Sequence, residues 1–224
     1  HADVFNDGDA LLKAVENDDV DLVKLLLDSG ADPNRAQNGS VFTRVVANGN
    51  KTIIQLFLDA GADLSRFGGS ALVVAVAKGN QPIIEALLDF GADPNATSVD
   101  YETAGDTALH AASRKGNVVL VSLLLRRGAD VNKRAARNAS VLYQAMANGH
   151  DAVVSLLVEK GATVTATDLR SAISKGDVTL LRSALAAFNP SASTDSDIES
   201  VYAAAELRGA DFSTAVLQRI PPRH

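Results

Sequence analysis

One tripeptide returns at regular intervals along most of the chain. Gly-Ala-Asp occurs four times and a fifth copy reads Gly-Ala-Thr, and the glycines of successive copies are 31, 30, 37 and 33 residues apart between Gly30 and Gly161. Self-similarity at such a period is typical of proteins built from stacked units, because one short unit cannot bury its own hydrophobic face. The chain is therefore predicted to fold as a stack rather than around one centre.

Each copy of the tripeptide is preceded, twelve residues earlier, by a residue expected to form a turn. The turn residues are Asp18, Gly49, Gly79, Gly116 and Gly149, and the series continues to Gly176 and Gly209 after the tripeptide has been lost. Dividing 224 residues by a period of about 33 predicts about seven units.

Between each turn and the next tripeptide lies an apolar pattern with helical spacing. In the second unit it reads Ile53, Ile54, Phe57 and Leu58, and offsets of 0, 1, 4 and 5 place such side chains on one stripe of a short helix. A second short helix, rich in small residues, is expected before each turn. The chain has 37 alanines but only ten aromatic residues, none of them Trp, which favours closely packed helices over a β-sandwich or barrel.

One unit matches a known repeat closely. Residues 107–112 read Thr-Ala-Leu-His-Ala-Ala, residues 115–117 read Lys-Gly-Asn, and residues 127–132 read Arg-Gly-Ala-Asp-Val-Asn. This unit resembles the ankyrin repeat, with Ala108 in place of the proline of the family's Thr-Pro-Leu-His signature. The other units keep the second helix and the Gly-Ala-Asp turn but lose that signature, and the resemblance covers nearly the whole chain.

The resemblance implies an all-α fold, an ankyrin-repeat α-solenoid of stacked helix-turn-helix units with short β-turn finger loops. We expect a single domain over residues 1–224, in which the last two repeats are degenerate and form the carboxy-terminal cap. Phe5 and the acidic first unit are expected to form the amino-terminal cap. The expected repeats are residues 5–34, 35–64, 65–95, 96–132, 133–165, 166–190 and 191–220.

Motifs that would carry catalysis or hold a cofactor are not found. Without cysteine the chain has no disulfide and no Cys-ligated metal site, and it contains no phosphate-loop, dinucleotide, zinc-helix or calcium-loop pattern. His1 and His224 are terminal, and His110 and His150 fall on the family's structural histidine positions. We therefore predict no catalytic residue, no metal and no cofactor. A small-molecule or enzymatic site in the concave groove, built from Arg44, Tyr143 and Arg170, is the less favoured alternative.

The remaining function is carried by the surface. Ankyrin domains usually bind partners through the finger loops and the concave face made by the first helices. An insertion at residues 96–105 lengthens one finger, and Tyr101, between Asp100 and Glu102, has the character of a hot-spot anchor. Phe67 is expected to be a second exposed aromatic on a finger. The predicted partner-binding residues are Arg44, Phe67, Asp100, Tyr101, Glu102, Arg114, Lys115, Lys133, Arg134, Tyr143, Gln144 and Arg170.

Charge excludes some partners and is unevenly distributed. The net charge of -6 disfavours a general nucleic-acid binder, and the longest apolar run, residues 71–77, is far shorter than the roughly 18 residues of a membrane span. Residues 1–34 carry nine acids against two bases, net -7, whereas residues 107–137 carry seven bases against one acid, net +6. Such an asymmetry could orient a partner, although a solvated patch explains it equally well.

These observations favour a non-catalytic module that binds another protein and is monomeric when free. One specific version is a stoichiometric inhibitor or immunity-type protein. The alternative is a targeting domain cut from a larger multidomain enzyme, which a first residue His1 would suit. Four Asn-x-Ser/Thr sequences are weak evidence for export, so the cytoplasm is the default compartment and export stays open.

Overall fold

A computed structural model describes residues 7–34, 41–99, 105–135 and 139–220. These residues form fourteen α-helices and one 3-10 helix, and they contain two isolated β-bridges and no β-strand. The chain divides into two compact units, residues 1–108 and residues 109–224. The all-α class predicted from the sequence is confirmed. Phe5 of the expected amino-terminal cap lies outside the described residues.

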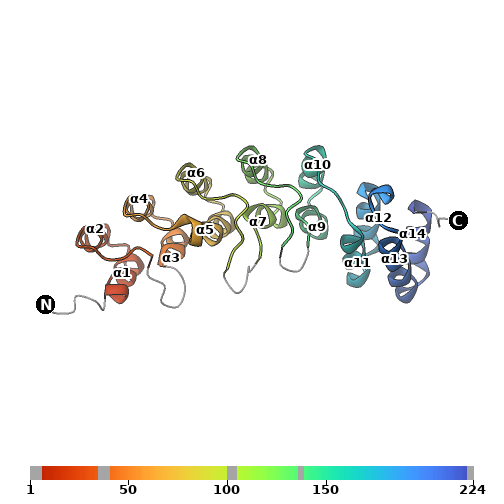
Figure 1. The fold of residues 1–224 in the computed structure, drawn as a ribbon, viewed down its shortest axis with the longest axis horizontal. Helices are drawn as coiled ribbons and strands as arrows, with labels where there is room; N and C mark the ends of the chain where they lie inside the picture. The colour runs from red at the N-terminus through yellow and green to blue at the C-terminus, as the bar shows by residue number, and fades with distance from the viewer. Residues whose placement is uncertain (1–6, 35–40, 100–104, 136–138, 221–224) are drawn as a thin grey trace. The chain divides into compact units, whose positions relative to one another are not determined.

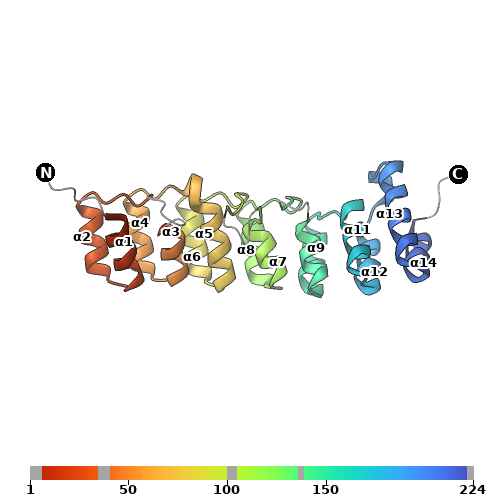
Figure 2. The same ribbon diagram turned by 90° about the horizontal axis from the view of Figure 1, so that it is seen from below.

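The first unit consists of helices in two rows. The first helices α1, α3 and α5 make one row and the second helices α2, α4 and α6 make the other, and the helices of each row lie side by side (Figures 1 and 2). The bounds are α1 Asp7–Glu16, α2 Val20–Asp28, α3 Val41–Asn48, α4 Lys51–Asp59, α5 Leu64–Lys78 and α6 Gln81–Asp89.

The second unit repeats this plan, with a departure at its carboxy-terminal end. There a 3-10 helix precedes α13, which is the longest helix described in the unit. The bounds are α7 Ala108–Arg114, α8 Val118–Arg126, α9 Val141–Ala147, α10 Asp151–Glu159, α11 Ala166–Lys175, α12 Val178–Ala187, η1 Pro190–Ala192, α13 Asp195–Arg208 and α14 Ala210–Arg219.

The turns lie where the repeat predicts them. All seven predicted turn residues have positive φ, as do the glycines of all five tripeptides. Glycine adopts this region without the steric cost that a Cβ imposes. The first turn is the exception, because Asp18 takes φ 57° without being glycine, and its carboxylate accepts a hydrogen bond of 2.8 Å from the Asn50 side chain.

The residue after each of these turns except Gly209 is the N-cap of the second helix that follows. Asn50, for example, accepts hydrogen bonds from the amides of Thr52 and Ile53 at 2.9 and 3.3 Å. Such a side chain satisfies amides that have no partner inside the helix, which explains the Asp and Asn residues at these positions. His150 occupies the same position before α10 but makes no side-chain cap bond.

One finger loop predicted from the sequence is helical instead. The sequence predicts Phe67 in an exposed finger formed by residues 66–69, but these residues lie in α5, and Phe67 is buried with 5% of its surface exposed. Asp63 starts this helix early, because its carboxylate accepts bonds from the amides of Ser65 and Arg66. The predicted exposure of Phe67 is therefore wrong. The Arg66 guanidinium lies over the Phe67 ring, 4.9 Å from its centroid.

Candidate functional site

The predicted binding residues on first helices differ in accessibility. Arg44 is exposed on α3 and Arg170 is exposed on α11, where its guanidinium donates to the Thr167 hydroxyl at 3.3 Å. Gln144 is half-buried on α9, and the neighbouring Tyr143 is buried at 9% exposure. Arg44 and Arg170 are thus accessible from solvent, whereas Tyr143 offers little surface.

Tyr143 is covered by a residue that the sequence did not point to. The Lys175 ammonium of α11 lies 5.7 Å from the Tyr143 ring centroid, a cation–π arrangement. Burial raises the pKa of the Tyr143 hydroxyl, and the Asp168 carboxylate raises it further because it would repel a phenolate. Tyr143 therefore stays neutral well above physiological pH and has no character of a general base.

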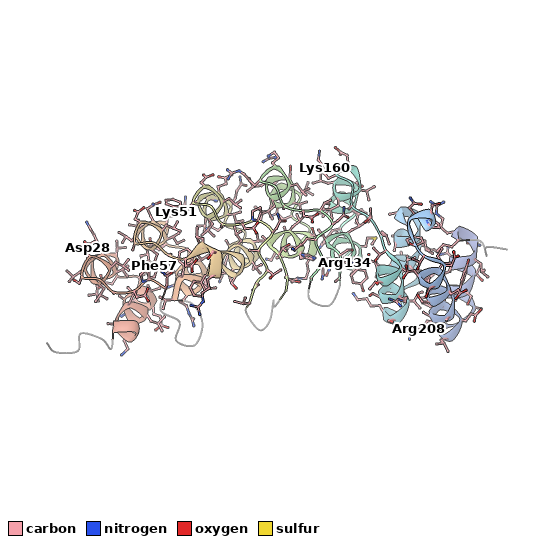
Figure 3. The ribbon with its side chains drawn as sticks, in the orientation of Figure 1. Asp28, Lys51, Phe57, Arg134, Lys160 and Arg208 are labelled. Atoms are coloured by element: carbon pink, nitrogen blue, oxygen red, sulfur yellow. The ribbon has the colours of Figure 1, made fainter. Side chains whose placement is uncertain are left out.

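Arg134 is held inside its own unit. Its guanidinium nitrogens lie 3.4 to 3.5 Å from the Asp168 carboxylate oxygens, and it also donates to the Thr165 hydroxyl. Asp168 is 1% exposed and closes a capping box with Thr165 at the start of α11 (Figure 3 labels Arg134). Arg134 thus compensates a buried carboxylate, while its neighbour Lys133 is exposed.

We expect Arg134→Ala to lower the free energy of unfolding by about 2 kcal/mol, because it leaves the buried Asp168 carboxylate without its cation. Lys133→Ala, the matched control on the same finger, is expected to change it by less than about 0.5 kcal/mol. Urea denaturation followed by circular dichroism measures both. Equal effects of the two variants would show that the ion pair does not stabilise the unit. To test the charge of this finger in partner binding, Lys133→Glu is preferable to a change at Arg134, because Lys133 is not part of the ion pair with Asp168.

The two internal histidines act as predicted, by tying one repeat to the next. His110 Nε2 lies 3.2 Å from the carbonyl oxygen of Ala139, and His150 Nε2 lies 2.9 Å from that of Arg114. His110 is fully buried, so its ring is not available to a substrate. Of the basic residues predicted at this rim, Lys115 is exposed and Arg114 is half-buried.

The residues at the two ends of the insertion, 97–99 and 105–106, form its stem and are held by several hydrogen bonds. Asp100, Tyr101 and Glu102 lie outside the described residues, but Ser98 donates its amide to the carbonyl of Asp106 at 2.8 Å and accepts from the amide of Gly105 at 2.9 Å. Ser98 is 2% exposed, with its hydroxyl 3.2 Å from that of Ser70 on α5, and Ser70 also accepts from the Val99 amide at 3.1 Å. The stem of the insertion is therefore fixed to α5.

One surface cavity of the described residues is lined by none of Arg44, Tyr143 and Arg170, which were considered as an alternative site. This cavity of about 470 Å³ lies between α12 and α14, where the Arg219 guanidinium already donates to the carbonyls of Leu185 and Ala186. Across the described segments, no three His, Asp or Glu side chains come together in a way that would hold a metal ion. In those segments no helix combines the length and apolar character needed to cross a bilayer.

In the first unit, helices α3 and α5 differ in charge from the row of second helices, whereas α1 carries three acids and one base. Helices α3 and α5 carry three bases, Arg44, Arg66 and Lys78, all exposed, and no acid. We call these three side chains the basic face. Helices α2, α4 and α6 of the other row carry five acids against two bases, net -3. Sequence reasoning missed Arg66 and Lys78, because their grouping depends on which helices share a row.

The family model for ankyrin repeats, described as three copies, matches residues 11–98 and again residues 97–168. The chain belongs to the ankyrin repeat family. Ankyrin repeats are generally protein–protein interaction modules and are typically non-catalytic. A search of the curated proteins gives no match to the chain.

Proposed function

We propose that this ankyrin repeat protein binds a partner protein through the row of first helices and the finger loops, without catalysing a reaction. The observation that carries the proposal is the basic face of α3 and α5, opposite in sign to the second-helix row of its own unit. A protein of net charge -6 that has no acid on α3 and α5 presents there a surface suited to an acidic partner.

The basic face is long enough to follow an extended segment. Arg66 and Lys78 are twelve residues apart on α5, which corresponds to about 18 Å along the helix axis, and α3 with Arg44 packs against α5. The nearest preceding acid, Asp63, is occupied at the start of α5, where the Ser65 hydroxyl lowers its pKa. Three positive charges over this length match acidic side chains spaced along a partner.

The charges set the rate and orientation of binding more than its strength. An exposed ion pair contributes only about 0 to 1 kcal/mol, whereas complementary charge can raise an association rate by orders of magnitude. Strength therefore has to come from other contacts. We assign that role to the insertion with Tyr101 and its neighbours Asp100 and Glu102, and in the second unit to Lys133, Gln144 and Arg170.

A stoichiometric inhibitor is the specific version of this proposal. Such a protein covers the surface that the partner needs for its own activity. When the partner is titrated with the inhibitor, the partner's activity then reaches zero at a one-to-one ratio. Binding that leaves the activity intact would favour a targeting role instead.

The test begins with affinity capture by the intact chain and identification of the captured protein by mass spectrometry. For that partner, we expect Arg44→Glu with Lys78→Glu to slow association at least tenfold at low salt, because both replaced bases belong to the basic face. The control is Lys24→Glu with Lys51→Glu, which changes the net charge by the same amount but on helices α2 and α4 of the other row (Figure 3 labels Lys51). This control should slow association less than about threefold.

Surface plasmon resonance at two salt concentrations gives these rates. The difference between the two double variants should shrink at high salt, since exposed charges are then screened. If both variants associate as fast as the wild type, or if the control is slowed as much, the basic face is not the binding surface.

A further inference from the structure

Two arginines line the surface cavity between α12 and α14, two helices that pack against each other at the blue end of Figure 1. The lining residues are Arg182, Leu185 and Ala186 from α12 and Ala215, Gln218 and Arg219 from α14. Each set of three has the spacing i, i+3 and i+4, which places its side chains on one side of the helix. The cavity therefore has one wall from each helix.

Two small residues keep this cavity open. Ala186 is the tenth residue after the turn at Gly176, and the residue at that position is larger in every other second helix: Asp28, Asp59, Asp89, Arg126, Glu159 and Arg219. Ala215 is the sixth residue after Gly209, and its equivalents are larger too: Lys24, Gln55, Glu85, Ser122, Ser155 and Arg182. The volume of about 470 Å³ that results lies within the usual range of small-molecule sites.

The cavity is basic, because none of its described lining residues is an acid. Helix α12 has no acid along its length. The acid of α14, Asp211, lies eight residues before Arg219, which corresponds to about 12 Å along the helix axis. Arg182 is exposed and has no hydrogen bond or ion pair within the described segments. Its positive charge is therefore not compensated there.

The second arginine is held in place at the edge of the cavity. The Arg219 guanidinium donates from Nε to the Leu185 carbonyl at 3.1 Å and from a terminal nitrogen to the Ala186 carbonyl at 3.4 Å. A guanidinium has five N–H groups, so three remain for a ligand. A group that is already ordered loses less conformational entropy on binding. Arg219 is thus prepared to accept an anion beside Arg182.

We propose that the α12–α14 cavity binds a small organic anion, a carboxylate on a short hydrocarbon body. The carboxylate accepts hydrogen bonds from Arg182 and Arg219, because the planar guanidinium matches its two oxygens. The hydrocarbon covers Leu185, Ala186 and Ala215, whose side chains have no polar atom. A sugar or a nucleotide would find only one neutral polar side chain in the lining, that of Gln218. This site is separate from the row of first helices proposed to bind the partner protein.

A second cavity offers a matched control. It has about 330 Å³ and is lined by Ser122, Leu125, Arg126 and Lys160. Both of its cations already have partners, because Arg126 donates to the Ser122 hydroxyl at 2.9 Å and the Lys160 ammonium lies 3.4 Å from the Glu159 carboxylate. Arg126→Gln therefore removes the same charge as Arg182→Gln, but at a cavity that is not expected to bind the anion.

The test is a titration of the intact, isotope-labelled chain with octanoate, followed through the amide resonances in NMR spectra. We expect saturable shifts at the carboxy-terminal halves of α12 and α14, with a dissociation constant of about 0.1 to 1 mM. Octanol and inorganic phosphate each carry only one part of the recognised chemistry, and each should bind about tenfold more weakly or worse. Octanol or phosphate binding as tightly as octanoate would overturn the proposed ligand class.

Two variants test the site itself. Arg182→Gln should weaken octanoate binding by about tenfold or more, because it removes the uncompensated cation. Ala186→Glu introduces an acid where α2, α4, α6 and α10 carry one, and it should abolish the shifts, since its carboxylate occupies the arginines. Both positions are exposed, so circular dichroism should show the fold unchanged, and Arg126→Gln should bind octanoate as the wild type does. The proposal is overturned if the wild type gives no saturable shifts, or if Arg182→Gln and Ala186→Glu bind as tightly as the wild type.

Discussion

Replacing Gly116 with alanine is expected to lower the free energy of unfolding by about 3 kcal/mol, through two costs that act together. Gly116 has φ +71°, a conformation that L side chains rarely adopt. A Cβ at this position would also lie 2.5 Å from Nδ1 of His150 and 2.7 Å from two carbons of the ring. The ring cannot simply rotate away, because its Nε2 is bonded to the Arg114 carbonyl at 2.9 Å.

Gly149 provides a control that isolates the second cost. It has the same φ of +71°, and an added Cβ would meet no atom within 4 Å. Gly149→Ala should therefore lower the free energy of unfolding by only about 1 kcal/mol, the cost of the backbone conformation. Urea denaturation followed by circular dichroism gives both values, and equal losses would show that the His150 ring yields freely.

A double variant tests the same contact from the other side. His150→Ala removes the ring and its bond to the Arg114 carbonyl, so it is destabilising by itself. In that background the alanine at position 116 meets no ring, and its added cost should fall to that of Gly149→Ala. The two changes are therefore expected to be less than additive, as neighbours in direct contact are.

Gly116 and Gly149 show which features of the structure could be predicted from the sequence. Spacing placed the turns at Gly116 and Gly149 correctly, because a positive φ is a local requirement that glycine meets in any repeat. The sequence could not distinguish the two sites, since the ring beside Gly116 comes from 34 residues further along and its position depends on how repeats stack. Local geometry was predictable, and contacts between repeats were not.

The binding surface was harder to predict for the same reason. The sequence predicts Phe67 on an exposed finger, in a stretch where Gly68 and Gly69 follow it. In the structure those glycines are helical, and Gly69 lies against the backbone of Thr97. Arg134 was assigned to a partner from its charge alone, whereas its counter-ion Asp168 is 34 residues away. The surroundings of both residues depend on long-range contacts that a repeat period does not encode.

The second large effect concerns those two glycines, which should respond to alanine with opposite signs. Alanine at either position favours the helix by about 1 kcal/mol relative to glycine. At Gly68 the added Cβ would lie 3.4 Å from the Cβ of Ala92, an ordinary contact, so Gly68→Ala should be neutral or stabilising by up to about 1 kcal/mol. At Gly69 it would lie 2.6 Å from the carbonyl oxygen and 2.9 Å from the carbonyl carbon of Thr97.

Gly69→Ala should lower the free energy of unfolding by about 2 kcal/mol, because a clash with backbone outweighs the gain in helix propensity. The stem of the insertion would have to move away from α5, which would break the bond from the Val99 amide to the Ser70 hydroxyl. Hydrogen exchange at Val99 should therefore rise in Gly69→Ala and stay unchanged in Gly68→Ala. If the two variants have the same stability and the same exchange at Val99, the insertion does not pack against α5. A partner that binds Tyr101 would then not depend on the contact between the insertion and α5.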